Sequence, residues 1–197
     1  MKNISISLLA IATLLAVTSC GCRENKKAAV ATEPAKAPEV ETYFSAIDRY
    51  LTEQIGKQYL EAEVCIPFYS YTAVDESNQD DILVWGDFWV DNYNVVGDTL
   101  MFVSGGNHPG KMHVRQDADG HFEVTAFDAV GDGSEFLSSA KEIFGDKFDA
   151  FQAANSDDTK RAECRTNTIA GYVQKHQLPV KVYKDYGWPA VTIPEIK

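Results

Sequence analysis

Positive charge is scarce in this chain. It has 18 lysine and arginine residues against 29 aspartate and glutamate residues, which gives a formal net charge of −11 at pH 7. Because proteins that bind nucleic acid neutralise its phosphates with lysine and arginine, this deficit argues against a nucleic-acid partner. It also argues against a domain that lies flat on an anionic lipid surface, and it is typical of soluble domains that repel one another.

Strongly apolar runs are also scarce. The only one, residues 4–17, follows Lys2 and is shorter than the ~20 apolar residues that a transmembrane helix needs. A positive residue, a short apolar run and small residues after it are typical of a secretory signal peptide. We therefore expect residues 1–19 to be a signal peptide, and we expect no transmembrane segment in residues 41–197.

The end of this run resembles the bacterial lipobox, in which an aliphatic residue and two small residues precede a cysteine. The four residues here are Val17, Thr18, Ser19 and Cys20. The resemblance implies cleavage before Cys20, a lipid in thioether linkage on its sulfur, and acylation of the new amino terminus. Several acyl chains anchor a protein far more firmly than one. A plain signal peptide with an incidental cysteine is the alternative.

Residues 20–40 contain few large apolar side chains and are rich in alanine, lysine, glutamate and proline. Such a composition cannot bury enough surface to offset the entropy of ordering. It predicts a flexible tether that carries one globular domain, residues 41–197. No acidic cluster directly follows Cys20, and by analogy with known sorting signals this favours the outer membrane, facing the periplasm, over the cell surface.

Cysteine is used only four times. The lipobox resemblance assigns Cys20 to the lipid, and Cys22 lies beside it on the tether. Cys65 and Cys164 belong to the folded domain, and an exported chain meets an oxidising compartment. A disulfide between them would close a loop of about a hundred residues and contribute ~4–5 kcal/mol in the chain-entropy model. Two buried free thiols are the alternative, because the sequence does not give the Cα separation that a disulfide requires.

Motifs of catalysis and metal binding are missing or incomplete. There is no GxSxG motif, and His108 lies in a run of glycine and proline that predicts an exposed turn. His113 and His121 lie on the polar side of a predicted hairpin, where proton transfer is conceivable but solvated polarity explains them equally well; their spacing is not that of a zinc site. Residues 117–120 match part of a calcium loop without its closing glutamate, and a hairpin turn accounts for them. We predict no catalytic residue, cofactor or metal site.

The most informative stretch is residues 81–96. Strand residues alternate between two faces, and one face carries apolar core residues such as Val84 and Phe88. The other face carries a stripe of aromatic and acidic residues: Trp85, Asp87, Trp89, Asp91 and Tyr93. Aromatic faces with a few polar groups suit sugars, peptides or cationic ligands, so the stripe is a candidate binding pocket. The alternative is packing beneath the first helix, the C-terminal segment or a second copy of the chain.

Hydrophobic periodicity and turn residues predict the remaining elements. A hairpin at 111–130 with its turn at 118–120 places Arg115 opposite Glu123, Val114 opposite Val124, His113 opposite Thr125 and Met112 opposite Ala126. The other predicted elements are helices over 41–60, from 132 to 151 and from 155 to 176, and strands over 64–74, 81–96, 98–106 and 180–188. This order predicts an α+β fold: a curved antiparallel sheet of four to five strands, with an N-terminal helix and two C-terminal helices on one face.

Residues 103–145 resemble a pattern of small extracytoplasmic bacterial domains, in which a Gly-Gly turn, a hairpin and a Gly-Ser helix start lead to an Ile-Phe pair. The resemblance implies a cystatin- or NTF2-like shape and no particular reaction. We expect a lipoprotein that acts as a binding or interaction module in the cell envelope, with a small ligand, an envelope protein or a second copy as partner. An NTF2-like enzyme that uses Asp87 or Asp91 as a base in an apolar pocket, and a purely structural envelope component, are the alternatives.

Overall fold

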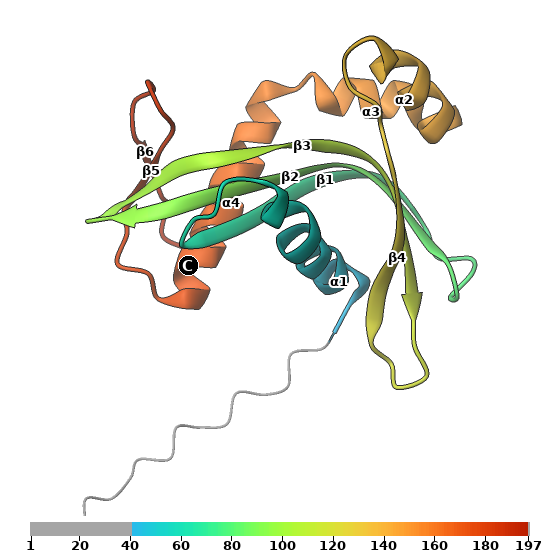
Figure 1. The fold of residues 1–197 in the computed structure, drawn as a ribbon, viewed down its shortest axis with the longest axis horizontal. Coiled ribbons are helices and arrows are strands. Elements are labelled where there is room, and N and C mark those ends of the chain that lie inside the picture. Colours follow the sequence, from blue (N-terminus) through green and yellow to red (C-terminus); the bar gives the residue numbers. More distant parts are fainter. Residues whose placement is uncertain (1–40, 197) are drawn as a thin grey trace, which may run out of the picture. The chain divides into compact units, whose positions relative to one another are not determined.

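The computed structural model describes residues 41–196 (Figure 1). The predicted signal peptide, the predicted lipidation site Cys20, Cys22 and the predicted tether lie outside the described residues. None of the described helices is long and apolar enough to cross a membrane.

A curled, mostly antiparallel sheet forms the centre of the domain (Figure 1). Its strands are β1 (Val64–Asp75), β2 (Ile82–Val96), β3 (Thr99–Gln116), β4 (Phe122–Ala129), β5 (Val182–Lys184) and β6 (Val191–Thr192). The order across the sheet is β1-β2-β3-β5-β6. Strand β3 pairs with β5 in parallel at its start and with β4 in antiparallel fashion at its end. The predicted α+β fold with a curved antiparallel sheet is confirmed.

Helices flank this sheet. Helix α1 (Tyr43–Tyr50) continues into a π-helical turn, η1 (Leu51–Ile55), and a 3-10 turn, η2 (Gly56–Gln58). After β4 come η3 (Gly133–Glu135), α2 (Phe136–Phe144), η4 (Gly145–Lys147), α3 (Phe148–Asn155) and α4 (Asp158–His176). The last helix, expected from residue 155, begins at Asp158, and the side chain of its cap Asp157 accepts a hydrogen bond from the Lys160 backbone N–H. Asp132, where the sequence predicts the start of the preceding helix, precedes η3, and its side chain makes no capping hydrogen bond.

Alternation along β2 sends its side chains to two sets of helices. On one side, Val84, Phe88 and Val90 are completely buried and pack with residues of α1 and η1. On the other side, Trp85 packs with Phe144 and Phe151 of α2 and α3, and further along the strand the stripe meets α4. The helices, expected together on one face, therefore divide between the two faces of the sheet, because β2 presents large apolar or aromatic side chains on both.

The β3–β4 hairpin follows the predicted register only near its turn. Val114 lies opposite Val124 as predicted, but a β-bulge follows, and His113 pairs with Ala126 instead of Thr125. The next pair is displaced in the same way, so the prediction is wrong for that end of the hairpin. The pairing of apolar with apolar side chains does not reveal a bulge. A bulge inserts one extra residue into one strand, and beyond it apolar side chains such as Met112 and Phe127 again lie opposite one another.

The segment of residues 104–110 is also different from the prediction, because it lies inside β3 and forms no turn. A Cβ atom on Gly105 would lie 2.2 Å from the Val90 carbonyl oxygen, and one on Gly106 would lie 2.1 Å from the Tyr59 hydroxyl. These glycines allow close approach of neighbouring groups within the sheet. The Gly-Gly pair is thus a packing feature of one long strand.

Candidate functional site

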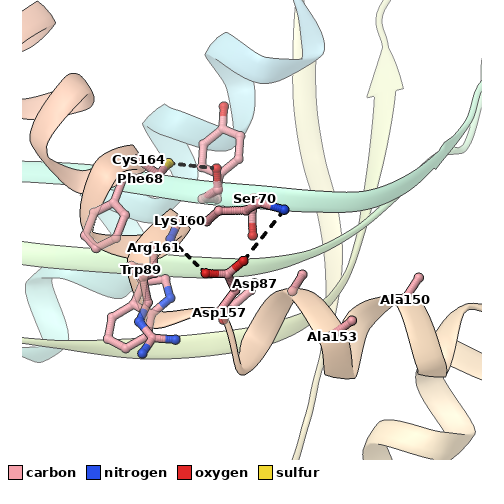
Figure 2. Close-up of a pocket in the computed structure, with 12 residues that line it drawn as sticks. Phe68, Ser70, Asp87, Trp89, Ala150, Ala153, Asp157, Lys160, Arg161 and Cys164 are labelled. Atoms are coloured by element: carbon pink, nitrogen blue, oxygen red, sulfur yellow. Dashed lines mark hydrogen bonds and ion pairs between the residues drawn. The ribbon is translucent and has the colours of Figure 1, made fainter.

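A cavity of about 470 Å³ lies on the stripe side of β2. Figure 2 shows it between strands β1 and β2 and helices α3 and α4. The strands contribute Phe68, Tyr69, Ser70, Asp87 and Trp89; the helical segment contributes Ala150, Ala153, Ala154, Asp157, Lys160, Arg161 and Cys164. The cavity therefore has an aromatic and alanine wall, one carboxylate from the sheet, and charged residues from the start of α4.

Asp87 is the acidic group that the sheet contributes to this cavity. It is only 3% exposed, and it makes no ion pair with any residue that the structure describes. The amide of Asn107 on β3 donates a hydrogen bond to Asp87 Oδ1 over 2.5 Å. Burial raises the pKa of Asp87, and neighbouring donors, together with the charge of Arg161, offset this effect only in part. Asp87 is thus a buried carboxylate that still has capacity to accept a hydrogen bond.

Asp91, two pleats further along, has a different environment. Its Oδ2 atom lies 2.7 Å from Arg165 Nε of helix α4 and accepts a hydrogen bond from the Tyr93 hydroxyl. The same guanidinium binds both oxygens of Asp185, at 2.6 and 2.7 Å. Because Asp91 pairs with Arg165, we assign it to the attachment of α4 to the sheet; beside Arg165 it also lines a smaller pocket of about 270 Å³.

The aromatic members of the stripe are mostly covered by helices. The Trp85 indole N–H donates to the Ile143 carbonyl over 2.9 Å, and Tyr93 is completely buried. Trp89 stacks on Phe68 with ring centroids 5.8 Å apart, and the Arg161 guanidinium lies 5.3 Å from its ring. The packing alternative is therefore realised by α2, α3 and α4 within one chain, while Asp87 and Trp89 still line a cavity.

Several residues of this cavity were not predicted from the sequence. Phe68 lies on the strand that pairs with β2, and Arg161 begins the last helix. The three cavity alanines belong to α3. The adjacent Lys160 and Arg161 at the start of a predicted helix are a signal of charge, but nothing in the sequence shows which strand they meet.

The disulfide predicted between Cys65 and Cys164 is not formed, and both residues are half-buried free thiols. The Cys164 thiol donates to the Tyr69 carbonyl over 3.5 Å. Cys65 lies against Gly56, whose Cβ position would be 2.6 Å from its sulfur. Burial raises the pKa of both thiols. The two cysteines therefore serve as small buried side chains in different contacts.

The histidines do not gather at one site. His108, expected to be exposed, is partly buried, and its Nε2 lies 2.8 Å from the Tyr59 hydroxyl. Burial lowers the pKa of His108. His113 Nδ1 lies 2.9 Å from Asp81, in the loop before β2. Each of these rings is held by its own partner, so the described residues provide no histidine pair for proton transfer.

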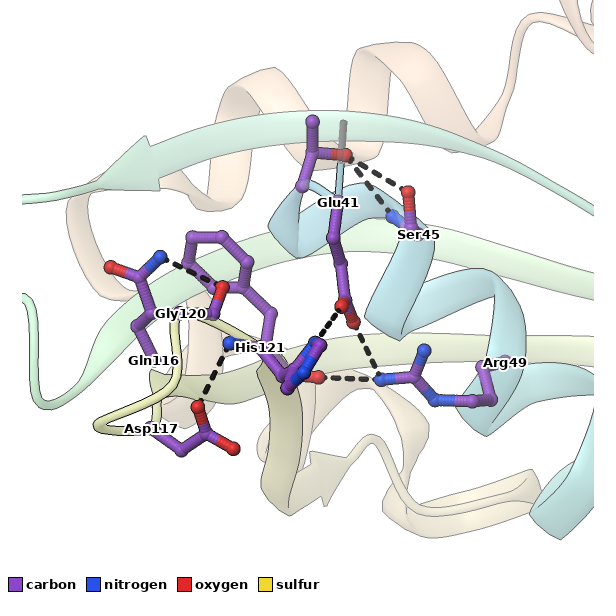
Figure 3. Close-up of polar contacts among 9 residues, drawn as sticks. Glu41, Ser45, Arg49, Gln116, Asp117, Gly120 and His121 are labelled. Atoms are coloured by element: carbon purple, nitrogen blue, oxygen red, sulfur yellow. Dashed lines mark hydrogen bonds and ion pairs between the residues drawn. The ribbon is translucent and has the colours of Figure 1, made fainter. Parts of the chain in front are cut away.

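His121 belongs to a polar cluster that joins the β3–β4 hairpin to the start of the domain (Figure 3). Its Nδ1 lies 2.6 Å from Glu41, which also pairs with Arg49 of α1 over 3.1 Å. In the turn, Asp117 Oδ1 accepts hydrogen bonds from the backbone N–H groups of residues 119 and 121, and Gly120 has φ +86°. The predicted turn at residues 118–120 is confirmed, with Gly120 in the left-handed region, and the Asp117 carboxylate is occupied by the turn. No cluster of three or more potential metal ligands occurs among residues 41–196.

The chain was compared with protein-family models, with curated proteins and with solved structures, and none of the three comparisons gives a significant match.

Proposed function

We propose that this chain is an exported lipoprotein whose domain, residues 41–197, binds a small ligand in the cavity between the β1–β2 sheet and helices α3 and α4. The lipobox-like residues Val17 to Cys20 support the membrane anchor and a place in the bacterial cell envelope, at the outer membrane on its periplasmic side. The observation that carries the binding function is Asp87, a buried carboxylate without an ion pair that lines a cavity of about 470 Å³.

The lining defines the chemistry of the ligand. Small-molecule sites are typically apolar clefts in which a few polar groups fix orientation. Phe68 and the alanines of α3 suit an apolar ring or chain, whereas Asp87 requires a group that donates a hydrogen bond or carries positive charge. The ligand is therefore a compact amphipathic molecule with a hydroxyl or amino group at the end that meets Asp87.

A second candidate function follows from the raised pKa of Asp87. A carboxylate in an apolar cavity is a stronger base than one in water, so Asp87 is suited to remove a proton from a bound substrate. Of the two carboxylates that the sequence suggested as bases, Asp91 is occupied by Arg165. The enzymatic reading therefore depends on Asp87 alone.

Native mass spectrometry of the full exported chain, released from membranes in mild detergent, tests the binding function. We expect a monomer that carries an additional, displaceable mass. The Asp87→Asn variant should bind the recovered molecule about tenfold more weakly, because a charged hydrogen bond is lost. Ala153→Trp should fill the cavity and remove the additional mass. Asp80→Asn, the same chemical change in an exposed loop, is the matched control and should bind as the unmodified chain does.

The same experiment separates the candidates. If the recovered molecule is unchanged after prolonged incubation with the protein, the domain binds without catalysis. If it is converted, and Asp87→Asn stops the conversion, Asp87 acts as a base. A chain that carries no additional mass in any envelope extract, or that is a dimer without additional mass, would contradict the small-ligand function.

A further inference from the structure

The Asp87 cavity has oppositely charged groups on its two walls (Figure 2). The sheet wall carries Asp87, and the helix wall carries the two cations Lys160 and Arg161 at the start of α4. Among the residues that the structure describes, these cations pair with Asp157 and Asp158 and not with Asp87. An acidic and a basic group therefore face one space without forming an ion pair. The inference below rests on the proposed function, because it names the ligand class of the same site.

Asp87 presents an oxygen atom that a ligand in the cavity can reach. Asn107 donates a hydrogen bond to Oδ1 of this carboxylate. In the described part of the chain, the fully buried side-chain atoms without a hydrogen-bond partner belong to Thr72, Trp89 and Asn92, and Asp87 Oδ2 is not one of them. This oxygen therefore keeps part of the small accessible surface of Asp87. Burial also raises the pKa of Asp87, as expected for a carboxylate without a close cation.

Arg161 has hydrogen-bond donors to spare at the opposite wall. Its Nη1 donates to the Asn155 carbonyl over 2.8 Å, and its Nη2 pairs with Asp158. A guanidinium group has five N–H donors, so the others stay available. The guanidinium lies 5.3 Å from the centre of the Trp89 ring, which also lines the cavity. Since a planar guanidinium is well suited to bind a carboxylate, the helix wall offers a site for an anionic group.

The charges on the two walls select the class of ligand. A simple amine would satisfy Asp87 but would bring its positive charge close to Lys160 and Arg161. A simple carboxylate would satisfy Arg161 but would be repelled by Asp87. A molecule that carries both charges meets an opposite charge at each wall, and such attraction is stronger away from bulk water. Arg161 is near enough for its charge to act on the pKa of Asp87, so the ligand that joins the two groups is short.

We propose that this cavity binds a free amino acid with an apolar side chain. The ammonium group of the amino acid donates to Asp87 Oδ2, and its carboxylate accepts hydrogen bonds from Arg161. Its side chain packs on Phe68 and on the alanines of α3, which form the apolar part of the lining. A cavity of about 470 Å³ lies within the range of small-molecule sites, about 300–1,000 Å³.

Isothermal titration calorimetry of the full chain in mild detergent tests this inference. The probe is L-phenylalanine, and the two matched probes are phenylethylamine, which lacks the carboxylate, and phenylpropanoate, which lacks the ammonium group. We expect saturable binding of phenylalanine. Phenylethylamine should bind about fivefold more weakly, because Arg161 is partly exposed. Phenylpropanoate should bind at least about tenfold more weakly, because Asp87 is buried.

Variants of Arg161 connect the carboxylate of the probe to its partner. Arg161→Gln should lower the affinity for phenylalanine to that for phenylethylamine, and should leave phenylethylamine binding no weaker than before. Arg161→Lys, which keeps the charge, should recover part of the affinity for phenylalanine. Arg115→Gln, the same chemical change in the β3–β4 hairpin outside the cavity, is the matched control and should bind all three probes as the unmodified chain does. Circular dichroism shows that each variant is folded.

The three probes also separate this inference from the proposed function. Phenylethylamine that binds as tightly as phenylalanine, an equal loss of both probes in a folded Arg161→Gln variant, or no saturable binding of phenylalanine would each overturn the inference. The additional mass in the native mass spectrum tests the small-ligand function by itself. A chain that carries a displaceable mass but fails with these probes therefore keeps that function and loses the amino-acid assignment.

Discussion

The link between Arg165 and Asp91 provides the sharpest test of how helix α4 is held on the sheet. The Arg165→Met variant keeps much of the side-chain length and removes the charge. Asp91, only 5% exposed, then loses its cation, while Asp185 is accessible enough to be solvated. Removing one partner of a buried pair leaves an uncompensated charge and costs about 3–5 kcal/mol. Because a domain is stable by only about 5–15 kcal/mol in total, this loss is large.

The pH dependence of this loss identifies its cause. Burial already raises the pKa of Asp91, and the Arg165 charge opposes that shift. Without Arg165 the folded-state pKa rises further above its unfolded value. A carboxyl whose pKa is raised by folding binds more protons in the native state, so its contribution to stability falls as pH increases through that window. The destabilisation by Arg165→Met should therefore be larger at about pH 7 than at about pH 5.

Urea unfolding of the full chain, followed by far-UV circular dichroism at both pH values, measures these free energies. The matched control is the double variant Arg165→Met with Asp91→Asn, which removes the buried charge as well and should recover more than half of the loss. A loss below about 1 kcal/mol at neutral pH, or a double variant as unstable as the single one, would refute the assignment of Asp91 as a buried counterion of α4.

Three further predictions concern other parts of the domain. Folding raises the pKa of His121 above 6.5 and lowers that of Glu41 below 4.5, so the pair stabilises the domain between these limits. The stabilisation is lost as pH rises through the folded pKa of His121. Glu41→Gln should remove this pH dependence from the midpoint of urea unfolding. A variant whose midpoint depends on pH as that of the unmodified chain does would contradict the pairing. Gly105→Ala should cost about 1–3 kcal/mol in urea unfolding because its methyl group meets a backbone carbonyl of β2, and a neutral effect would show that β3 lies elsewhere. Finally, alkylation of the unfolded chain without reductant should label both Cys65 and Cys164, whereas a mass two hydrogens lower with neither residue labelled would demonstrate a disulfide.

Local features of the sequence determined the elements of this domain. The alternation of residues 81–96 predicted a strand with two distinct faces, and the structure has β2 there. The Asp-Ala-Asp-Gly turn and, to within a few residues, the start of the last helix were also predictable, because turns and caps depend on hydrogen bonds between residues close in sequence. The order of these helices and strands along the sequence predicted an α+β fold with a curved antiparallel sheet.

Tertiary structure decided which carboxylate of the aromatic and acidic stripe is held in an ion pair. In the sequence Asp87 and Asp91 are equivalent, two pleats apart on one face of one strand. Only the docking of α4 separates them, since it brings Arg165 to Asp91 and leaves Asp87 at a space beside α3. Contacts between residues more than seventy positions apart carry no local signal, because they depend on how whole elements pack. The division of the helices between two faces and the separate environments of Cys65 and Cys164 are of the same kind.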